Sequence, residues 1–297
     1  MFGFGERIHA RRHRPSRSPM NDRTSPASAR PLSSPVTAKE VVKAAEHGWL
    51  RGFLKARLEP KAYLGLHLTV GLILGAAGIW IFGAVLDALL DNATMVRWDI
   101  ATDAFIHSHM TPGMLRIVAA TTEFGGPLAM GVLGVVGAMV LWRTGRRVVL
   151  VGWIAAFAGA SIIDQALKMA VHRSRPAYGA AFVQAGSFSF PSGHAMGSMI
   201  GYGMLIWTLF VIWHPRHTWK VVIYLLAGLL VLAIGLSRIF LGVHYPSDVV
   251  GGWAAALAWL AVCITGVNVA RHRHAEIATP EAMATLAAAS ADRKGQP

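Results

Sequence analysis

Three clusters of polar and charged residues interrupt long apolar segments in the second half of this chain. They are KMAVHRSRP at 168–176, PSGH at 191–194 and SRIFLGVHYPSD at 237–248. Charged side chains are costly beside apolar segments long enough to enter a membrane, and they usually serve a function there. The three clusters are therefore the first candidates for chemistry.

Two of the clusters contain a histidine in a setting that favours chemistry. His244 and Asp248 are four residues apart, so the carboxylate can accept a hydrogen bond from one imidazole nitrogen. The other nitrogen is then free to act as a nucleophile or base. His194 follows Ser192 and Gly193 at an expected helix start. A small residue, a hydroxyl and unpaired amides at such a position form a cradle for an anion.

Three cations accompany the histidines. Lys168 and Arg175 are seven residues apart and lie on nearly one face of a helix, which Pro176 should end near Arg175. Arg238 supplies a third positive charge. Cations placed in this way stabilise the charge that develops on a phosphoryl group. With no carboxylate cluster suited to Mg²⁺, the pattern predicts phosphoryl transfer through a covalent phosphohistidine, with no metal and no cofactor.

Other interpretations of these residues stay open. Lys168, Arg173 and Arg175 could anchor helices at the membrane interface, and His244 could be a hydrogen-bonded loop residue. The same cations could also serve a non-catalytic protein that binds or transports lipid headgroups. Such a protein would keep its function when the imidazole of His244 is removed, because binding needs charge and no nucleophile.

Four further polar residues are not assigned to the site. His107 and His109 have a spacing that metal ligands can have, but no cysteine or defined carboxylate accompanies them. We therefore predict no metal site there. Asp164 lies one turn before Lys168, and we interpret it and Glu123 as structural partners.

The composition indicates the elements that must position the clusters. The chain is 54% hydrophobic and only 14% charged, which excludes an ordinary soluble globule. Six stretches approach the roughly 20 residues that a membrane helix needs, and Gly125, Gly126 and Pro127 interrupt the second, where we expect a kink or a separate helix. The stretches are 64–90, 114–142, 148–170, 195–213, 219–236 and 249–269. The predicted fold is an all-α, polytopic bundle of six transmembrane helices.

The formal charge of +13 is informative through its placement. Arginine and lysine collect in the N-terminal tail, between spans two and three, between spans four and five, and after span six, at residues 11–17, 143–147, 216–220 and 271–273. The positive-inside rule makes these regions cytoplasmic, so both termini are predicted inside and all three clusters on the outer face. The charge then needs no nucleic-acid partner.

The chain divides into four predicted parts. Residues 1–36 are rich in Arg, Ser and Pro and predict a disordered, basic cytoplasmic tail. Residues 37–60 predict an amphipathic helix on the inner leaflet. Residues 61–270 form the six-helix membrane domain, and residues 271–297 a cytoplasmic C-terminal tail. The single cysteine, Cys263, excludes an intramolecular disulfide.

The motifs K-x6-RP, PSGH and SR-x5-H-x3-D resemble those of the type 2 phosphatidic acid phosphatase superfamily. This family of lipid phosphate phosphatases also includes vanadium haloperoxidases and soluble acid phosphatases. The resemblance implies that His244 attacks phosphorus, Asp248 orients it and His194 exchanges protons with the leaving group and water. It also implies phosphate binding by Lys168, Arg175, Ser192, Gly193 and Arg238.

The membrane spans favour a lipid substrate over the peroxidase alternative, because the peroxidases of this family are soluble. We expect a multi-pass protein of the cell (inner) membrane that hydrolyses a lipid phosphate facing the periplasm or cell exterior. The outward site favours undecaprenyl diphosphate, with phosphatidate, phosphatidylglycerophosphate and the lipid A phosphate as alternatives. The oligomeric state cannot be predicted from these motifs.

Overall fold

The computed structural model describes residues 63–91, 93–178, 188–213 and 216–277, in which every regular element is a helix. The helices are α2 (Tyr63–Asp91), α3 (Ala93–His109), α4 (Pro112–Glu123), α5 (Pro127–Arg143), α6 (Arg147–Val171), α7 (Gly193–Trp213), α8 (His217–Phe240) and α9 (Pro246–Ile277). This confirms the all-α prediction. The tail predicted over 1–36 and the interfacial helix predicted over 37–60 lie outside the described residues.

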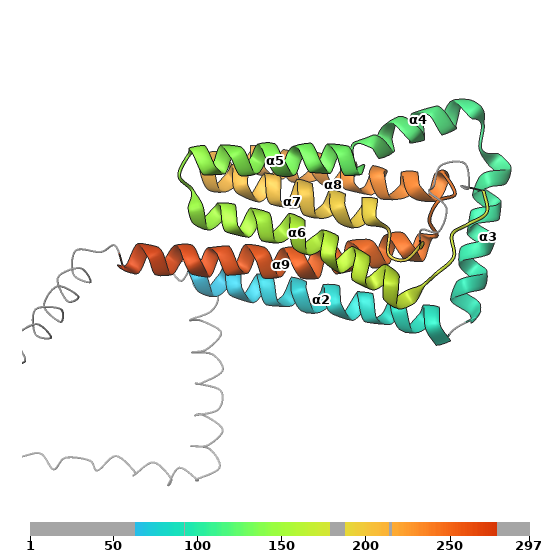
Figure 1. Ribbon diagram of the computed structural model, residues 1–297, viewed down its shortest axis with the longest axis horizontal. Coiled ribbons are helices and arrows are strands. Elements are labelled where there is room, and N and C mark those ends of the chain that lie inside the picture. The colour runs from blue at the N-terminus through green and yellow to red at the C-terminus, as the bar shows by residue number, and fades with distance from the viewer. Residues whose placement is uncertain (1–62, 92, 179–187, 214–215, 278–297) are drawn as a thin grey trace, which may run out of the picture. The chain divides into compact units, whose positions relative to one another are not determined.

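Within the described ranges, six helical stretches are long and apolar enough to cross a membrane. They are Leu68–Asp91, Pro112–Arg143, Arg147–Val171, Gly193–Trp213, His217–Phe240 and Pro246–His274. The number of spans predicted from the sequence is therefore confirmed, and the chain is a multi-pass membrane protein. In Figure 1, α2 and α5 to α9 run side by side, while α3 crosses their end.

The second span is broken where the sequence indicates. Helix α4 ends at Glu123 and α5 begins at Pro127, with Gly126 as its N-cap residue. Proline suits the first helical position, because its missing N–H would have no partner there. The break lets α4 lean away from the axis of α5 (Figure 1). The structure therefore confirms a separate helix before a shorter span.

Large apolar side chains lie on the outside of the helices as well as inside. Leu72 on α2, Leu128 on α5 and Leu225 on α8 are 71%, 79% and 62% exposed. Such surfaces would aggregate in water, but they are the normal lipid-facing surface of a membrane bundle. The core instead lies between α5, α6, α7 and α9, where Trp153 and Met204 are fully buried.

Small residues bring α2 and α9 into close contact, and the two helices run side by side in Figure 1. A Cβ atom added at Gly78 would lie 2.7 Å from the backbone N of Ala258 and 2.8 Å from the backbone O of Ala254. Backbone atoms cannot move aside as a flexible side chain can. Close approach through small residues is the usual way in which membrane helices associate.

We predict that Gly78→Ala destabilises the protein, because its methyl group would force α2 away from α9. Overpacking of this kind costs about 1–3 kcal/mol. The matched control is Gly83→Ala on the same helix, where an added Cβ meets nothing within 4 Å. Both variants gain the same helix propensity, so the difference in apparent melting temperature in detergent isolates the contact. Equal melting temperatures would contradict the prediction.

Candidate active site

Arg173 and Arg175 follow the end of α6 and lie on a non-helical segment. Helix α6 ends at Val171, because His172 takes the left-handed conformation (φ 51°) and its N–H bonds the carbonyl of Lys168 at 3.0 Å. The sequence-based prediction that the helix continues to about Arg175 is therefore wrong. Lys168 stays in the last turn, where it pairs with Asp164 at 2.6 Å.

The PSGH segment places the start of α7 against these cations. The peptide bond between Phe190 and Pro191 is cis, and α7 begins at Gly193. A Cβ at Gly193 would lie 3.2 Å from both Lys168 Nζ and Asp164 Oδ2, so the missing side chain permits this close approach. The Ser192 hydroxyl is buried and has no hydrogen-bond partner within the described residues.

The turn between α8 and α9 carries the second histidine. Gly242 has a φ of +64°, which reverses the chain after α8 and returns His244 toward Arg238. The backbone N–H of His244 donates to the carbonyl of Arg238 at 3.3 Å. Arg238 is only 8% exposed and donates through Nη1 to Thr122 Oγ1 on α4 at 2.8 Å. The turn is therefore fixed to α8, and the cation is fixed to α4.

Asp248 stabilises the first turn of α9 and faces His244. Its Oδ2 accepts the backbone N–H of Tyr245 at 2.9 Å, as an acidic residue does in a capping box. The same oxygen accepts the Ser189 hydroxyl and lies 3.5 Å from His244 Nδ1. The contact with the imidazole is long, whereas the bonds to the backbone and to Ser189 are shorter. Asp248 is thus fixed mainly by groups other than His244.

The contacts of His244 indicate which nitrogen carries the lone pair. Its Nε2 lies 3.0 Å from Nη1 of Arg175, which also donates to the carbonyl of Val243 at 2.7 Å. A guanidinium can only donate, so Nε2 must accept and the proton belongs on Nδ1, facing Asp248. Burial lowers the pKa of His244 to about 4, an effect that Arg175 and Arg238 reinforce and Asp248 opposes. The imidazole is therefore neutral near pH 7.

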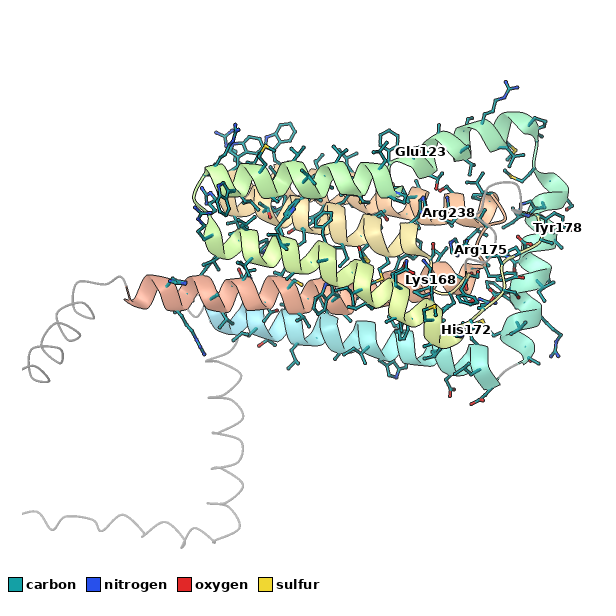
Figure 2. The ribbon with its side chains drawn as sticks, in the orientation of Figure 1. Glu123, Lys168, His172, Arg175, Tyr178 and Arg238 are labelled. Carbon is teal, nitrogen blue, oxygen red and sulfur yellow. The ribbon has the colours of Figure 1, made fainter. Side chains whose placement is uncertain are left out.

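A cavity of about 930 Å³ joins these groups. Its polar end is lined by Lys168, Arg175, Gly193, His194, Arg238 and His244, and its apolar part by Met130, Val135, Ile154, Phe157, Met196 and Ile200. Figure 2 shows Lys168, Arg175 and Arg238 toward the end of the bundle that α3 crosses. Six of the eight predicted site residues thus line one cavity, while Ser192 and Asp248 are buried outside its lining.

His194 lies beside the break between α4 and α5. A Cβ added at Gly126 would lie 3.7 Å from His194 Nε2 and 3.3 Å from the carbonyl of Glu123. The absence of a side chain at Gly126 therefore leaves room next to the imidazole nitrogen.

Sequence analysis missed the residues that hold Asp248 in place. Arg173 donates through Nη1 to Asp248 Oδ1 at 2.5 Å and through Nη2 to Asp99 Oδ2 on α3 at 2.7 Å. Burial lowers the pKa of Arg173, but Asp248 and Asp99 outweigh this effect, so the pKa lies above its ordinary value. One available signal was the position of Asp99 between Val96 and Asp103, on the helix stripe that packs inward.

Known proteins resemble this chain in sequence and in fold. A family model described as the PAP2 superfamily matches residues 148–271. Decaprenylphosphoryl-5-phosphoribose phosphatase of Mycobacterium tuberculosis is 32% identical over 186 residues, which are 60% of this chain and 94% of the relative. Phosphatidylglycerophosphatase B of Bacillus subtilis is 36% identical over 100 residues, 32% of this chain, and the match spans about half (47%) of that protein.

A solved structure shows a similar fold. It is the transmembrane PAP2 type phosphatidylglycerolphosphate phosphatase from Bacillus subtilis, with a TM-score of 0.55 and 24% identity over 65% of this chain and 95% of that one. Fold, motifs and relatives together define a membrane-embedded phosphatase that acts on lipid phosphates. The chain belongs to the PAP2 superfamily.

We predict that Thr122→Val lowers phosphate release, because the guanidinium of Arg238 loses its side-chain acceptor and is no longer aimed into the cavity. A hydrogen bond to a charged group contributes about 1.5–3 kcal/mol, so kcat/KM should fall roughly tenfold or more. Thr121→Val is the matched control, since the Thr121 hydroxyl donates within its own helix to the Ile117 carbonyl at 2.9 Å. Equal losses in both variants would show that Thr122 does not aim Arg238.

Proposed function

We propose that this phosphatase hydrolyses a membrane lipid phosphate through a phosphohistidine formed on Nε2 of His244. The contact between Nε2 and Arg175 Nη1 carries the proposal, because it places a lone pair beside a group that binds phosphate oxygens. When a phosphate binds, its oxygens replace the imidazole as the acceptor of the Arg175 N–H groups. The phosphorus then lies in front of Nε2.

In the first step, Nε2 of His244 forms a bond to phosphorus as the bond to the leaving oxygen breaks. His194, which lines the same cavity as His244, gives its proton to that oxygen. In the second step, His194 takes a proton from water, whose oxygen attacks phosphorus and breaks the P–N bond. The products are inorganic phosphate and the dephosphorylated lipid, and both histidines return to their starting states.

The cations of the cavity hold the phosphate during both steps. Lys168, Arg175 and Arg238 approach it from α6, the segment after α6 and α8, and oppose the charge on its oxygens. The amide of Gly193 is unpaired as the first of a helix, and a phosphate oxygen would also satisfy the buried hydroxyl of Ser192. Positioning of this kind is the main catalytic contribution in phosphoryl transfer.

The substrate is a lipid because the polar end of the cavity continues into an apolar part between α5, α6 and α7. An acyl or prenyl chain fits such a surface. The distribution of arginine and lysine supports an orientation with both termini in the cytoplasm and the site on the outer side. The membrane would be the cell (inner) membrane, with the site facing the periplasm or cell exterior.

The names of the relatives favour one class among the candidate lipids. Phosphatidylglycerophosphate and decaprenylphosphoryl-5-phosphoribose each carry a terminal phosphomonoester on a polyol that a phosphodiester joins to the lipid. We therefore place such a lipid before undecaprenyl diphosphate, the candidate that the outward orientation suggests. Phosphatidate and the lipid A phosphate complete the set.

We predict that His244→Ala abolishes phosphate release from every lipid substrate, by about 10³-fold or more, since the nucleophile is lost. His194→Ala should reduce the rate by about 10²–10⁴-fold. The matched control, His109→Ala, removes an exposed imidazole of α3 and should change nothing. Substantial turnover by His244→Ala would contradict the phosphohistidine and favour the headgroup-binding alternative. Loss of activity with EDTA would contradict a metal-free reaction.

We predict that purified protein in detergent releases phosphate faster from phosphatidylglycerophosphate and decaprenylphosphoryl-5-phosphoribose than from undecaprenyl diphosphate or phosphatidate. The measurement is kcat/KM for each lipid in matched micelles, with His244→Ala as the background. A preference for undecaprenyl diphosphate would reverse the order and favour the orientation argument. Equal kcat/KM values for all four lipids would show that the site recognises the terminal phosphate and does not distinguish the rest of the headgroup.

A further inference from the structure

A chain of buried charges connects α3, outside the region that the family model matches, to the nucleophile. The carboxylates of Asp99 and Asp248 are both 0% exposed, and the side chain of Arg173 between them is 12% exposed. The bonds from Asp99 to Arg173 and from Arg173 to Asp248 measure 2.7 and 2.5 Å. The Arg173 guanidinium also lies 4.3 Å above the ring of Tyr245. The two carboxylates therefore contact the edge of the guanidinium, and the aromatic ring contacts its face.

Asp99 reaches Asp248 by a second route. Its Oδ1 accepts the backbone N–H of Ser247 at 3.2 Å, and its Oδ2 accepts the Ser247 hydroxyl. That backbone N–H is one of those that α9 leaves unpaired at its start. Asp99 thus supports the helix turn that carries Asp248 and also the arginine that holds it. Both routes lead to Asp248, whose carboxylate faces His244.

We propose that Asp99 and Arg173 are positioning residues of the hydrolysis reaction, which fix Asp248 and through it the imidazole of His244. The proposal rests on the proposed function of His244 as nucleophile. Arg173 occupies Oδ1 of Asp248, so that Oδ2 is the oxygen that faces His244 Nδ1. Neither Asp99 nor Arg173 lines the cavity, so they act through Asp248.

The same charges set how basic the nucleophile is. Arg173 opposes the carboxylate charge that favours the imidazolium of His244, and Asp99 in turn opposes Arg173. Removing the positive charge of Arg173 should therefore raise the pKa of His244, and removing the negative charge of Asp99 should lower it. The other charged groups around His244 are Lys168, Arg175, His194, Arg238 and Asp248, and all of them stay unchanged in both variants.

The test compares Asp99→Asn, Arg173→Gln and Arg173→Lys in the full-length protein purified in detergent. The probe is phosphate release from phosphatidylglycerophosphate, measured as kcat and KM across pH. We expect Asp99→Asn to lower kcat about 100-fold with little change in KM, as misplacement of a reacting group does. Because His244 must be neutral to attack, the acid limb of kcat/KM should move to lower pH in Asp99→Asn and to higher pH in Arg173→Gln.

The matched control is Asp103→Asn. Asp103 lies one turn after Asp99 on α3 and is 4% exposed, but it pairs with His107 at 3.3 Å. Its variant should keep kcat within about twofold of the wild type and leave the acid limb in place, because the described contacts pair the Asp103 carboxylate with His107 and with neither Arg173 nor Asp248. Arg173→Lys keeps the positive charge but loses the two guanidinium nitrogens that bond Asp99 and Asp248 separately. It should therefore lower kcat without moving the acid limb of the pH profile.

Distinct outcomes overturn the proposal. It is wrong if Asp99→Asn retains wild-type kcat, if Asp103→Asn loses as much, or if both charge-removing variants move the acid limb in one direction. If Asp99→Asn does not fold, the comparison of Arg173→Gln with Arg173→Lys still decides: the acid limb should move in the first and stay in place in the second, and a purely structural role would not make the limb depend on charge. Turnover by His244→Ala in the same assay would instead overturn the proposed function itself.

Discussion

The guanidinium of Arg173 between the carboxylates of Asp99 and Asp248 is the interaction on which the site depends. It joins three parts of the chain that are distant in sequence: α3, the segment after α6 and the start of α9. Two carboxylates with no access to water would be very costly alone. One cation pairs with both, and the arrangement that forms these two ion pairs also places His244 beside Arg175.

Residues without side chains give the helices and turns the room to reach this arrangement. Gly193 brings the start of α7 against Lys168, and Gly242 reverses the chain before His244. Gly126 leaves space beside His194 in the break of the second span. Charge therefore draws the segments together, and the absence of a Cβ at these three positions lets them approach. The apolar surfaces of α2, α5 and α8 remain turned outward, where a bilayer covers them.

Much of the fold followed from sequence because long apolar helices have few alternatives. The number of spans and the break at Gly126 and Pro127 depend on hydropathy and on proline sterics, which are local. The end of α6 at Val171 was missed, since a left-handed histidine leaves no clear sequence signal. Helical periodicity can mark Asp99 as an inward-facing residue, but it does not reveal the partner, because Arg173 is distant in sequence and only packing brings the two together.

The position of Asp99 also bears on how such a protein can be rearranged. The region that the family model matches begins at residue 148, so it contains every predicted phosphate ligand and both histidines but not α3. If that region were placed in another helical bundle, Arg173 would keep Asp248 as its counter-charge but would lose Asp99. The smallest unit that keeps both counter-charges of Arg173 is therefore the motif region together with α3, a helix that carries no motif. Insertions between α3 and α6 are tolerable only where they leave that helix across the same end of the bundle.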